Sequence, residues 1–561
     1  MEYIVFGIVV LALVLLIFGK GLYDEHRDYK RFLNRLRNHY GEPEKKEYRA
    51  EQYASIASYF THHPKEDQVD DITWNDLNMD EIFQGMDDTF SSAGQEVLYH
   101  VLRTPRFLEA ELEHFEELVQ YFTEHTEERV KVQLLLKRLG FTGRFSLYEY
   151  LEHLDILGSR SNVKHYISNL LYIPFFICCF FYPSLGVSGL ILCMLYNIFG
   201  YFKDKNEIDP YITSFAYVMR LVDISGKMAA ALPREMEEEA ETLRKHRKQL
   251  GKFKRGSFWL MSSGRMSGSG NPLDIFLDYA RMIFHLDLIK FNTMLEQVRF
   301  HTEDVDFLFY TIGYLETAIV TGAYRKSLSE GYCIPVLSKS REHTYLSAKE
   351  IYHPLIANPV KNSITAKRGV LLTGSNASGK STFLKTVAIN AIFAQTIHTA
   401  LADSYEGNYF HICTSMALRD DLVGGESYYI VEIRSLKRIL NHAAEDKPVL
   451  CFVDEVLRGT NTVERIAAST EILKSLTAGN VLCFAATHDV ELTGLLEAEY
   501  DNYHFEEEIV EGDVRFQYRL LSGKATTRNA IKLLGVMGYE EKIISNAEER
   551  AEHFLKTGQW H

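Results

Sequence analysis

The chain has 561 residues, enough for three or four domains, because a domain typically takes about 100 to 200 residues. Its 46% hydrophobic and 24% charged residues exclude a chain dominated by disorder. The net charge of -15 excludes a surface that is basic all over, so contact with nucleic acid would need a local basic patch. The 7 cysteines lack paired or metal-ligand spacing, which predicts reduced, buried thiols.

Uncharged apolar stretches predict three membrane-spanning helices. Residues 3–19 carry no charge, and about 17 residues nearly match a hydrocarbon core of about 30 Å. A cleaved signal peptide is the alternative, but Glu2 precedes this stretch and no small-residue cleavage site follows it. Residues 166–202 contain no Asp, Glu, Lys or Arg, and Pro183 to Gly186 can divide them into two spans. A helical hairpin buried in a soluble core is the alternative for this pair.

Basic residues flank these stretches on the sides that the positive-inside rule places in the cytoplasm. Arg27, Lys30 and Arg31 follow the first stretch, and Arg160 and Lys164 precede the second. We therefore predict a multi-pass protein of the cell membrane, with the lipid bilayer as a partner. Its expected parts are an anchor at 1–22, a cytoplasmic helical region at 23–164 and a transmembrane hairpin at 165–203.

Helical periodicity predicts a lever-like helical domain over residues 204–344. An acidic run from Glu235 to Glu241 precedes a basic run from Arg244 to Arg255. The basic run could meet DNA phosphates or anionic lipid headgroups, or it could be a solvated helix end, and the sequence leaves the three open. From about residue 345, short β-branched runs alternate with helices, which predicts an α/β domain over 345–540 and a helical tail over 541–561.

A complete Walker A motif lies near the start of the α/β domain. A strand-like run at 369–373 leads into Gly374, Ser375, Asn376, Ala377, Ser378, Gly379, Lys380 and Ser381, and a helix continues from Thr382. Glycines at both ends let the loop curl so that its backbone N–H groups point at phosphate oxygens. We expect Lys380 to reach the β- and γ-phosphates and Ser381 to place its hydroxyl on Mg²⁺. The strand, loop and helix context makes a chance glycine-rich turn a poor alternative.

Two later strand ends complete the predicted site. A buried-strand run at 448–453 ends in Asp454 and Glu455, where Asp454 would hold Mg²⁺ and Glu455 would act as general base. The next strand-like run, 480–486, ends near His488, which could sense the γ-phosphate or orient the attacking water. Together these residues predict an ATP hydrolase that uses ATP and Mg²⁺.

The residues between and around these motifs resemble the MutS family. Residues 420–432, with Gly424, Gly425, Ser427 and Glu432, resemble its version of the ABC signature, and residues 458–462 resemble its D-loop. His353-Pro354 is similar to the pair that the family places near the nucleotide base. Met86 to Gly94 resembles the start of the MutS core domain, and Gly523 to Lys556 resembles the C-terminal dimerisation segment.

The resemblance implies an α/β P-loop ATPase of the ABC/MutS type, with a mixed sheet and flanking helices, beside a mainly α-helical core and lever domain and the three transmembrane helices. It also implies a head-to-tail homodimer in which Gly425 and Ser427 of one subunit cap the γ-phosphate held by Lys380 of the other. In three respects the sequence departs from the family. No mismatch-reading domain fits before residue 70, Glu426 stands where the signature commonly has Arg, and no base-stacking aromatic stands near Pro359.

The expected function is that of a membrane-anchored MutS-like ATPase that couples ATP binding and hydrolysis in a dimer to double-stranded DNA, in work related to mismatch repair. A membrane regulatory or scaffolding switch that does not read DNA is the alternative from another class. An ABC-type transporter subunit is the third possibility, which the lack of charged residues within the apolar stretches disfavours.

Overall fold

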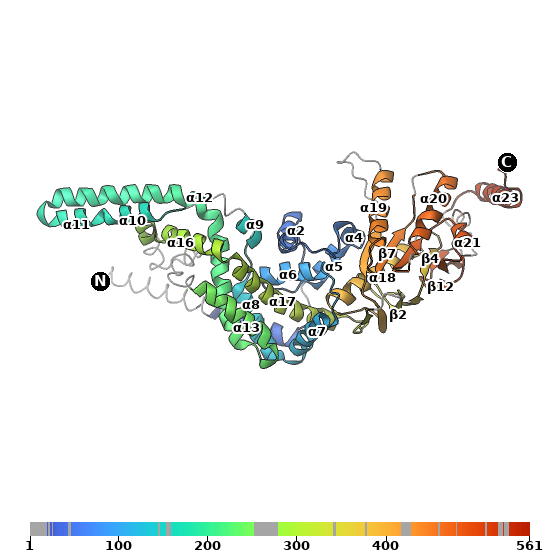
Figure 1. Cartoon of the computed structure of the whole chain (residues 1–561), viewed down its shortest axis with the longest axis horizontal. Helices are drawn as coiled ribbons and strands as arrows, with labels where there is room; N and C mark the ends of the chain where they lie inside the picture. The colour runs from blue at the N-terminus through green and yellow to red at the C-terminus, as the bar shows by residue number, and fades with distance from the viewer. Residues whose placement is uncertain are drawn as a thin grey trace, which may run out of the picture. The chain divides into compact units, whose positions relative to one another are not determined.

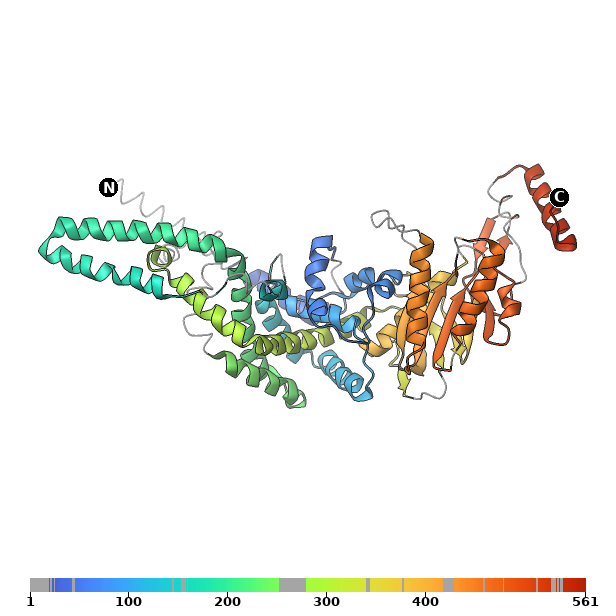
Figure 2. The ribbon, with the colours of Figure 1, turned by 45° about the horizontal axis from the view of Figure 1, so that its top comes forward.

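A computed structural model describes residues 20, 23–24, 26–42, 46–143, 146–152, 158, 160–251, 279–339, 344–375, 378–416, 428–457, 460–477, 479–510, 513–525, 531, 534 and 538–560. The chain divides into two compact units. The helical unit combines Met1–Pro64, Met86–His100 and Glu117–Ser327, and the sheet unit combines Lys65–Gly85, Val101–Glu116 and Leu328–His561. Figures 1 and 2 show their elements.

Among the described residues, the elements up to Ser327 are helices, and the strands begin at Val336. The helices are α2 (Ala50–Ile56), α3 (Ser58–His62), α4 (Asp71–Asp76), α5 (Met79–Met86), α6 (Ser92–Leu102), α7 (Glu109–Glu124), α8 (Thr126–Leu139), α9 (Leu147–Glu152), α10 (Val163–Leu170), α11 (Tyr172–Phe181), α12 (Pro183–Ala231), the 3-10 helix η2 (Arg234–Met236), α13 (Glu237–Gln249), α16 (Leu286–Phe300), α17 (Thr302–Ser327), α18 (Lys380–Thr396), α19 (Tyr428–Ala443), α20 (Thr462–Ser475), α21 (Leu492–Leu495) and α23 (Glu541–Thr557). The strands are β1 (Val336–Ser338), β2 (Leu346–Ile351), β3 (Asn362–Ala366), β4 (Gly369–Thr373), β5 (Ser404–Asn408), β6 (His411–Ser415), β7 (Val449–Asp454), β8 (Val481–Ala486), β9 (Tyr500–His504), β10 (Glu507–Val510), β11 (Asp513–Phe516) and β12 (Leu521–Ser522).

An apolar hairpin forms one part of the helical unit. Helix α11 ends at Phe181 and α12 begins at Pro183, where proline suits the first turn of a helix. Figure 1 shows the two helices side by side. Within the described residues, Val163–Phe181 and Pro183–Ile208 are the two helices long and apolar enough to cross a membrane. The expected first span at 3–19 lies outside the described residues, and α12 continues unbroken past residue 203 to Ala231.

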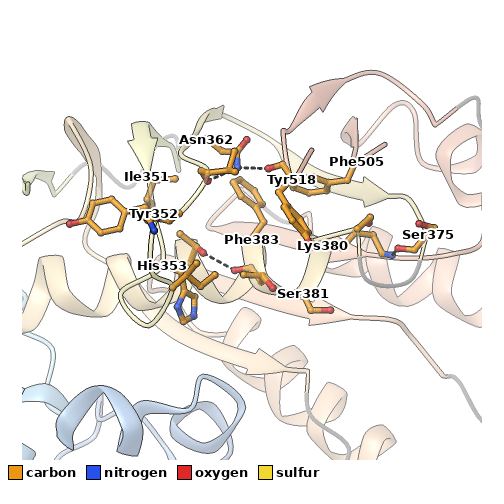
Figure 3. A pocket seen from close by; sticks show the side chains of 18 of the residues that line it. Ile351, Tyr352, His353, Asn362, Ser375, Lys380, Ser381, Phe383, Phe505 and Tyr518 are labelled. Carbon is orange, nitrogen blue, oxygen red and sulfur yellow. Dashed lines mark hydrogen bonds between the residues drawn. The ribbon is translucent and has the colours of Figure 1, made fainter. Parts of the chain in front are cut away.

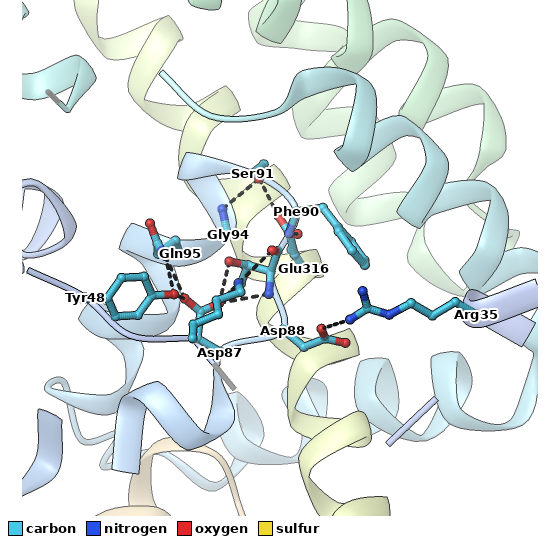
Figure 4. A network of polar contacts seen from close by, with 11 residues as sticks. Arg35, Tyr48, Asp87, Asp88, Phe90, Ser91, Gly94, Gln95 and Glu316 are labelled. Atoms are coloured by element: carbon cyan, nitrogen blue, oxygen red, sulfur yellow. Dashed lines mark hydrogen bonds and ion pairs between the residues drawn. The ribbon is translucent and has the colours of Figure 1, made fainter. Parts of the chain in front are cut away.

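A buried polar network holds the segment that resembles the MutS core, and Figure 4 shows it at the start of α6. The carboxylate of Asp87 is fully buried and accepts from Lys46 Nζ at 3.0 Å. The carboxylate of Glu316, on α17, accepts from the backbone N–H of Phe90 and from the hydroxyl of Ser91. Burial raises the pKa of Glu316 to about 7. A Cβ at Gly94 would lie 2.1 Å from Glu316 Oε2, so only glycine permits this approach.

The sheet unit is built on a six-stranded sheet of order β12-β9-β4-β8-β7-β6, in which all neighbours except β12 and β9 are parallel. Every residue of β7 and β8 is buried, as expected for central strands covered on both faces. Cys451 and Cys483 belong to the core cluster shared with α19 and α20, whereas Phe452 and Phe484 stack on each other at 5.4 Å. A second sheet has the order β1-β5-β2-β3.

Helix α4 covers the edge strand β6. The backbone N–H of Thr414 donates to Thr73 Oγ1 at 3.2 Å, and the hydroxyl of Thr414 donates to Asp76 Oδ2 at 2.6 Å. The same oxygen of Asp76 accepts from the backbone N–H of Met416 at 2.9 Å. Residues 65–85 therefore cap the sheet at the edge strand β6, whose neighbour β7 ends in Asp454.

Candidate nucleotide-binding site

Both ends of the loop between β4 and α18 have backbone conformations that suit glycine. Gly374 has a φ of 144° and Gly379 a φ of 110°, values that favour glycine at both ends of the loop. A Cβ at Gly374 would lie 2.7 Å from the backbone oxygen of Phe505, so a side chain there would strike backbone. Gly379 is the residue before α18, whose N-terminus therefore faces the inside of the loop.

The side chains of Lys380 and Ser381 take the positions expected of a phosphate and magnesium site. Lys380 Nζ donates to the backbone oxygens of Gly374 and Ser375, each at 2.8 Å. Ser381 Oγ donates to Asp454 Oδ2 at 2.5 Å, across 73 residues of sequence. The Walker A hydroxyl and the Walker B carboxylate are thus brought together.

Glu455 and His488 meet at the ends of neighbouring strands. The backbone N–H of Glu455 donates to the oxygen of Ala486 at 2.9 Å, which aligns the carboxyl ends of β7 and β8. His488 Nε2 contacts Glu455 Oε1, and both side chains keep part of their surface exposed. Glu455 has a φ of 60° and Leu457 a φ of 58°, both unusual for residues with a side chain.

Glu432, on α19, stabilises this strained turn. Its side chain is 3% exposed and accepts a hydrogen bond from the backbone N–H of Leu457. Glu432 was predicted only as part of the signature resemblance. Its contact indicates that the glutamate holds the residues after Glu455 in place, so a residue near the signature supports the Walker B turn of the same chain.

A cavity of about 900 Å³ opens beside the loop, as Figure 3 shows. Its polar end is lined by Ser378, Lys380, Ser381, Thr382, Glu455 and His488. Its lining also includes apolar and aromatic side chains, those of Ile351, Ile356, Pro359, Val360, Phe505 and Tyr518. Such a cavity can take a triphosphate at its polar end and a flat apolar group against these side chains.

Two of the aromatic side chains that line this cavity, Phe505 and Tyr518, come from the end of the domain, whereas Tyr352 and Phe383 lie closer in sequence to the loop. Tyr518 lies next to the loop, because a Cβ at Gly379 would be 3.2 Å from its ring. The side chain of Asn362 holds the backbone around Tyr518. Its amide donates to the oxygen of Tyr518 at 3.0 Å, and its side-chain oxygen accepts from the N–H of Leu520 at 2.7 Å. The fold thus brings aromatic rings that are distant from Pro359 in sequence to the same cavity.

Glu507 is a second residue that sequence reasoning missed. Its side chain is 6% exposed and accepts from Ser375 Oγ at 2.8 Å. It reaches the loop because β9 pairs with β4 and ends at His504, beside Thr373. A carboxylate therefore lies against the loop that is expected to bind phosphate.

His353 lines the cavity, as the resemblance implies for the His-Pro pair. Burial, with a smaller contribution from Lys385, lowers the pKa of His353 to about 4. Its Nδ1 accepts from the backbone N–H of Leu355 at 3.2 Å. His353 is therefore neutral at physiological pH and adds no positive charge to the phosphate end.

The oxygen ligands at the polar end suit Mg²⁺. Ser381 and Asp454 offer a hydroxyl and a carboxylate, and Mg²⁺ usually takes one or two such protein ligands together with phosphate oxygens and water. Among the described residues, no group of three or more His, Cys, Asp or Glu side chains could hold a metal ion by itself. This arrangement fits a metal that enters with a nucleotide.

Some predicted site residues lie outside the described residues. They are Asn376 and Ala377 of the loop, Gly425 and Ser427 of the signature, and Arg458 and Gly459 of the D-loop. Their roles remain predictions.

Comparison with known proteins identifies the domain that carries this cavity. Residues 370–555 match MutS domain V. The DNA mismatch repair protein MutS of Thermus thermophilus is 33% identical over 179 residues, which cover 32% of this chain and 22% of that protein. The MutS protein of Thermotoga sp. strain RQ2 is 31% identical over 278 residues, covering 48% of this chain and 34% of that protein.

The MutS protein of Thermotoga maritima is 30% identical over 286 residues, covering 49% of this chain and 35% of that protein. The chain thus spans about a third or less of the length of these relatives. The loop geometry, the paired strand ends and the domain match agree, and residues 370–555 form an ATPase domain of the MutS family, domain V.

Proposed function

We propose that this protein is a membrane-anchored MutS-like ATPase that binds and hydrolyses ATP as a homodimer and couples this cycle to double-stranded DNA. The observation that carries the ATPase part is the meeting of Lys380, the Ser381–Asp454 pair and the Glu455–His488 pair at one end of a cavity. In this reading each residue has one task.

Lys380 exchanges its two backbone partners for the β- and γ-phosphate oxygens, while the loop N–H groups hold the rest of the triphosphate. Mg²⁺ bound to Ser381 and Asp454 would neutralise charge on the same phosphates. Glu455 accepts a proton from the attacking water, and His488 orients the carboxylate that it contacts. Tyr518 and Phe505 lie where they can contact the adenine ring.

Exposed apolar side chains support the homodimer. Ile430, Val431 and Ile433 are 38–41% exposed in the first turns of α19, at the end of the predicted signature. Val463 is 75% exposed in the first turn of α20, directly after the predicted D-loop. A cluster of apolar side chains at the two segments expected to face the partner is typical of an interface. Gly425 and Ser427 would then cap the γ-phosphate of the other subunit.

The apolar hairpin supports the membrane anchor. Its large side chains are well exposed along both helices, including Phe180 at 76%, Leu192 at 70% and Phe199 at 80%. Exposure of so long an apolar surface to water is strongly unfavourable, whereas lipid acyl chains would cover it. The buried-hairpin alternative for Val163–Ile208 is therefore disfavoured.

The DNA part depends on kinship with mismatch repair proteins, and one observation favours the alternative of a switch that does not read DNA. Arg244, in the predicted basic patch, donates to Glu237 at 2.5 Å within α13, so part of this cationic charge is already balanced. The end of the run, 252–255, lies outside the described residues.

The test uses the full-length chain in lipid nanodiscs. We expect ATP hydrolysis that requires Mg²⁺, and duplex DNA binding whose affinity falls linearly with salt on a double-logarithmic plot. Magnesium-dependent hydrolysis without DNA binding at low salt, with or without ATP, would favour the regulatory switch. A lack of magnesium-dependent nucleotide binding would refute the ATPase itself.

A further inference from the structure

The base of the hairpin holds a set of buried polar side chains that reach a third segment. Asn197, on α12, is 1% exposed and its amide donates to the backbone oxygen of Ile283 at 3.0 Å. Asn169, on α10, donates to the backbone oxygen of Phe284 at 2.8 Å. Residues 279–284 are helical, and His285, with a φ of 55°, ends this helical segment.

These hydrogen bonds pair backbone oxygens at the end of a helical segment. The turn at His285 frees the backbone oxygens of the preceding residues, which in water would be hydrated. Here the amides of Asn169 and Asn197 satisfy them, and His285 Nε2 contacts the backbone oxygen of Asn197 at 2.9 Å. Such pairing of backbone oxygens is what an apolar surrounding requires.

Charged pairs show where the aqueous side begins. Lys164 pairs with Asp204 at 2.7 Å, and Lys205 lies 3.7 Å from Asp287. From Pro183 to Asp204 the helix rises about 32 Å, which matches a hydrocarbon core of about 30 Å. Asn197 lies seven residues before Asp204, about 10 Å closer to the tip of the hairpin.

Ile283 and Phe284 accept hydrogen bonds from Asn197 and Asn169, so they lie at the same depth as these two residues. At that depth they are closer to the tip of the hairpin than the charged pairs are. Tyr279 is 56% exposed and Phe284 is 41% exposed, and the ring of Phe284 lies 5.7 Å from that of Tyr172 on α11. Arg281 is only 2% exposed, so its side chain is turned toward protein. The outward surface of the segment is therefore aromatic.

We propose that residues 279–284 are embedded in the cytoplasmic leaflet beside the hairpin, with lipid acyl chains against Tyr279 and Phe284. This inference rests on the proposed membrane anchor. It changes the predicted lever domain at 204–344, because one part of that domain then contacts lipid directly. Any movement of α16, which follows His285, would therefore also displace residues 279–284 at the membrane surface.

Three phenylalanines of the helical unit allow a matched test. A photo-crosslinking benzoylphenylalanine replaces Phe180, Phe284 or Phe300, one at a time, in the full-length chain. Phe180 lies near the hairpin tip and is 76% exposed, and Phe300 is 79% exposed at the far end of α16. Each variant is reconstituted in phosphatidylcholine vesicles with about 30% phosphatidylglycerol, which imitates an anionic membrane surface, and lipid adducts are detected by mass spectrometry.

We expect lipid adducts at positions 180 and 284, with at least a tenfold lower yield at position 300. Adducts at 180 alone would overturn this inference and leave the membrane anchor standing. A lack of adducts at 180 would overturn the anchor, and equal yields at 284 and 300 would overturn the depth assignment. In a second comparison, Asn197→Leu should lower the yield at position 284 but leave that at position 180 unchanged.

Discussion

Replacing Glu455 by glutamine should nearly abolish ATP hydrolysis while ATP binding persists. Glutamine keeps the size of the side chain but cannot accept a proton, and loss of a general base typically costs about 10² to 10⁴ in rate, or about 3 to 5 kcal/mol of barrier. Binding should persist because Lys380 and the Ser381–Asp454 pair are unchanged. The retained nucleotide should also hold the proposed dimer together.

Two measurements on the same preparation check this prediction. Phosphate release at saturating MgATP gives the turnover rate, and equilibrium titration gives the affinity. Glu491→Gln is the matched control, because Glu491 lies on the surface three residues after His488, and this variant should hydrolyse ATP at the unaltered rate. Turnover by Glu455→Gln within threefold of the unaltered protein would show that another group takes the proton.

Three further predictions concern binding and stability. Lys380→Ala should weaken MgATP binding at least about tenfold, because a charge-assisted contact to phosphate is worth about 1.5 to 3 kcal/mol; unchanged affinity by titration would refute the loop assignment. Asp76→Ala should lower the melting temperature of the sheet unit by several degrees, at about 2–4 °C per kcal/mol, since it leaves the Met416 N–H and the Thr414 hydroxyl without this acceptor. Because the pKa of Glu316 is raised from 4.5 to about 7 by burial, the folded chain keeps a proton that the unfolded chain has lost, so its contribution to stability is lost as pH rises through 7. Glu316→Gln should remove that part of the pH dependence in melting curves from about pH 5 to 8, and an identical dependence in both proteins would contradict this.

The parts of the site that were predicted from the sequence are those set by short stretches of chain. The loop from Gly374 to Ser381 needs only its own glycines and the helix that follows. Asp454 and Glu455 could be placed because they end an apolar run, and parallel strands bring their carboxyl ends to one edge. The meeting of Ser381 with Asp454 follows from that rule and is confirmed by their hydrogen bond.

The residues that sequence reasoning missed depend on strand pairing far along the chain. Phe505 and Glu507 reach the loop because β9 pairs with β4 in a register that sets His504 opposite Thr373. Nothing in the local sequence of Glu507 distinguishes it from its acidic neighbours. Asp76 is similar, because its partners Thr414 and Met416 lie more than 300 residues away. For Phe505 alone the sequence offered an indication of a place near the site, because this residue directly follows a strand-like run.

The contacts of the site explain why nucleotide binding should depend strongly on Mg²⁺. Four polar side chains expected to handle the triphosphate already have a protein partner: Lys380 bonds to loop oxygens, Ser375 to Glu507, Ser381 to Asp454, and His488 to Glu455. Binding is therefore largely an exchange of hydrogen bonds, each worth about 0.5 to 1.5 kcal/mol net, and a bare triphosphate would also meet three carboxylates, those of Asp454, Glu455 and Glu507. A divalent cation bound to Asp454 would attract the phosphates and so offset that repulsion. The site should therefore bind the complex of ATP with Mg²⁺ much more tightly than free ATP. Free ATP should then compete poorly with MgATP for the site.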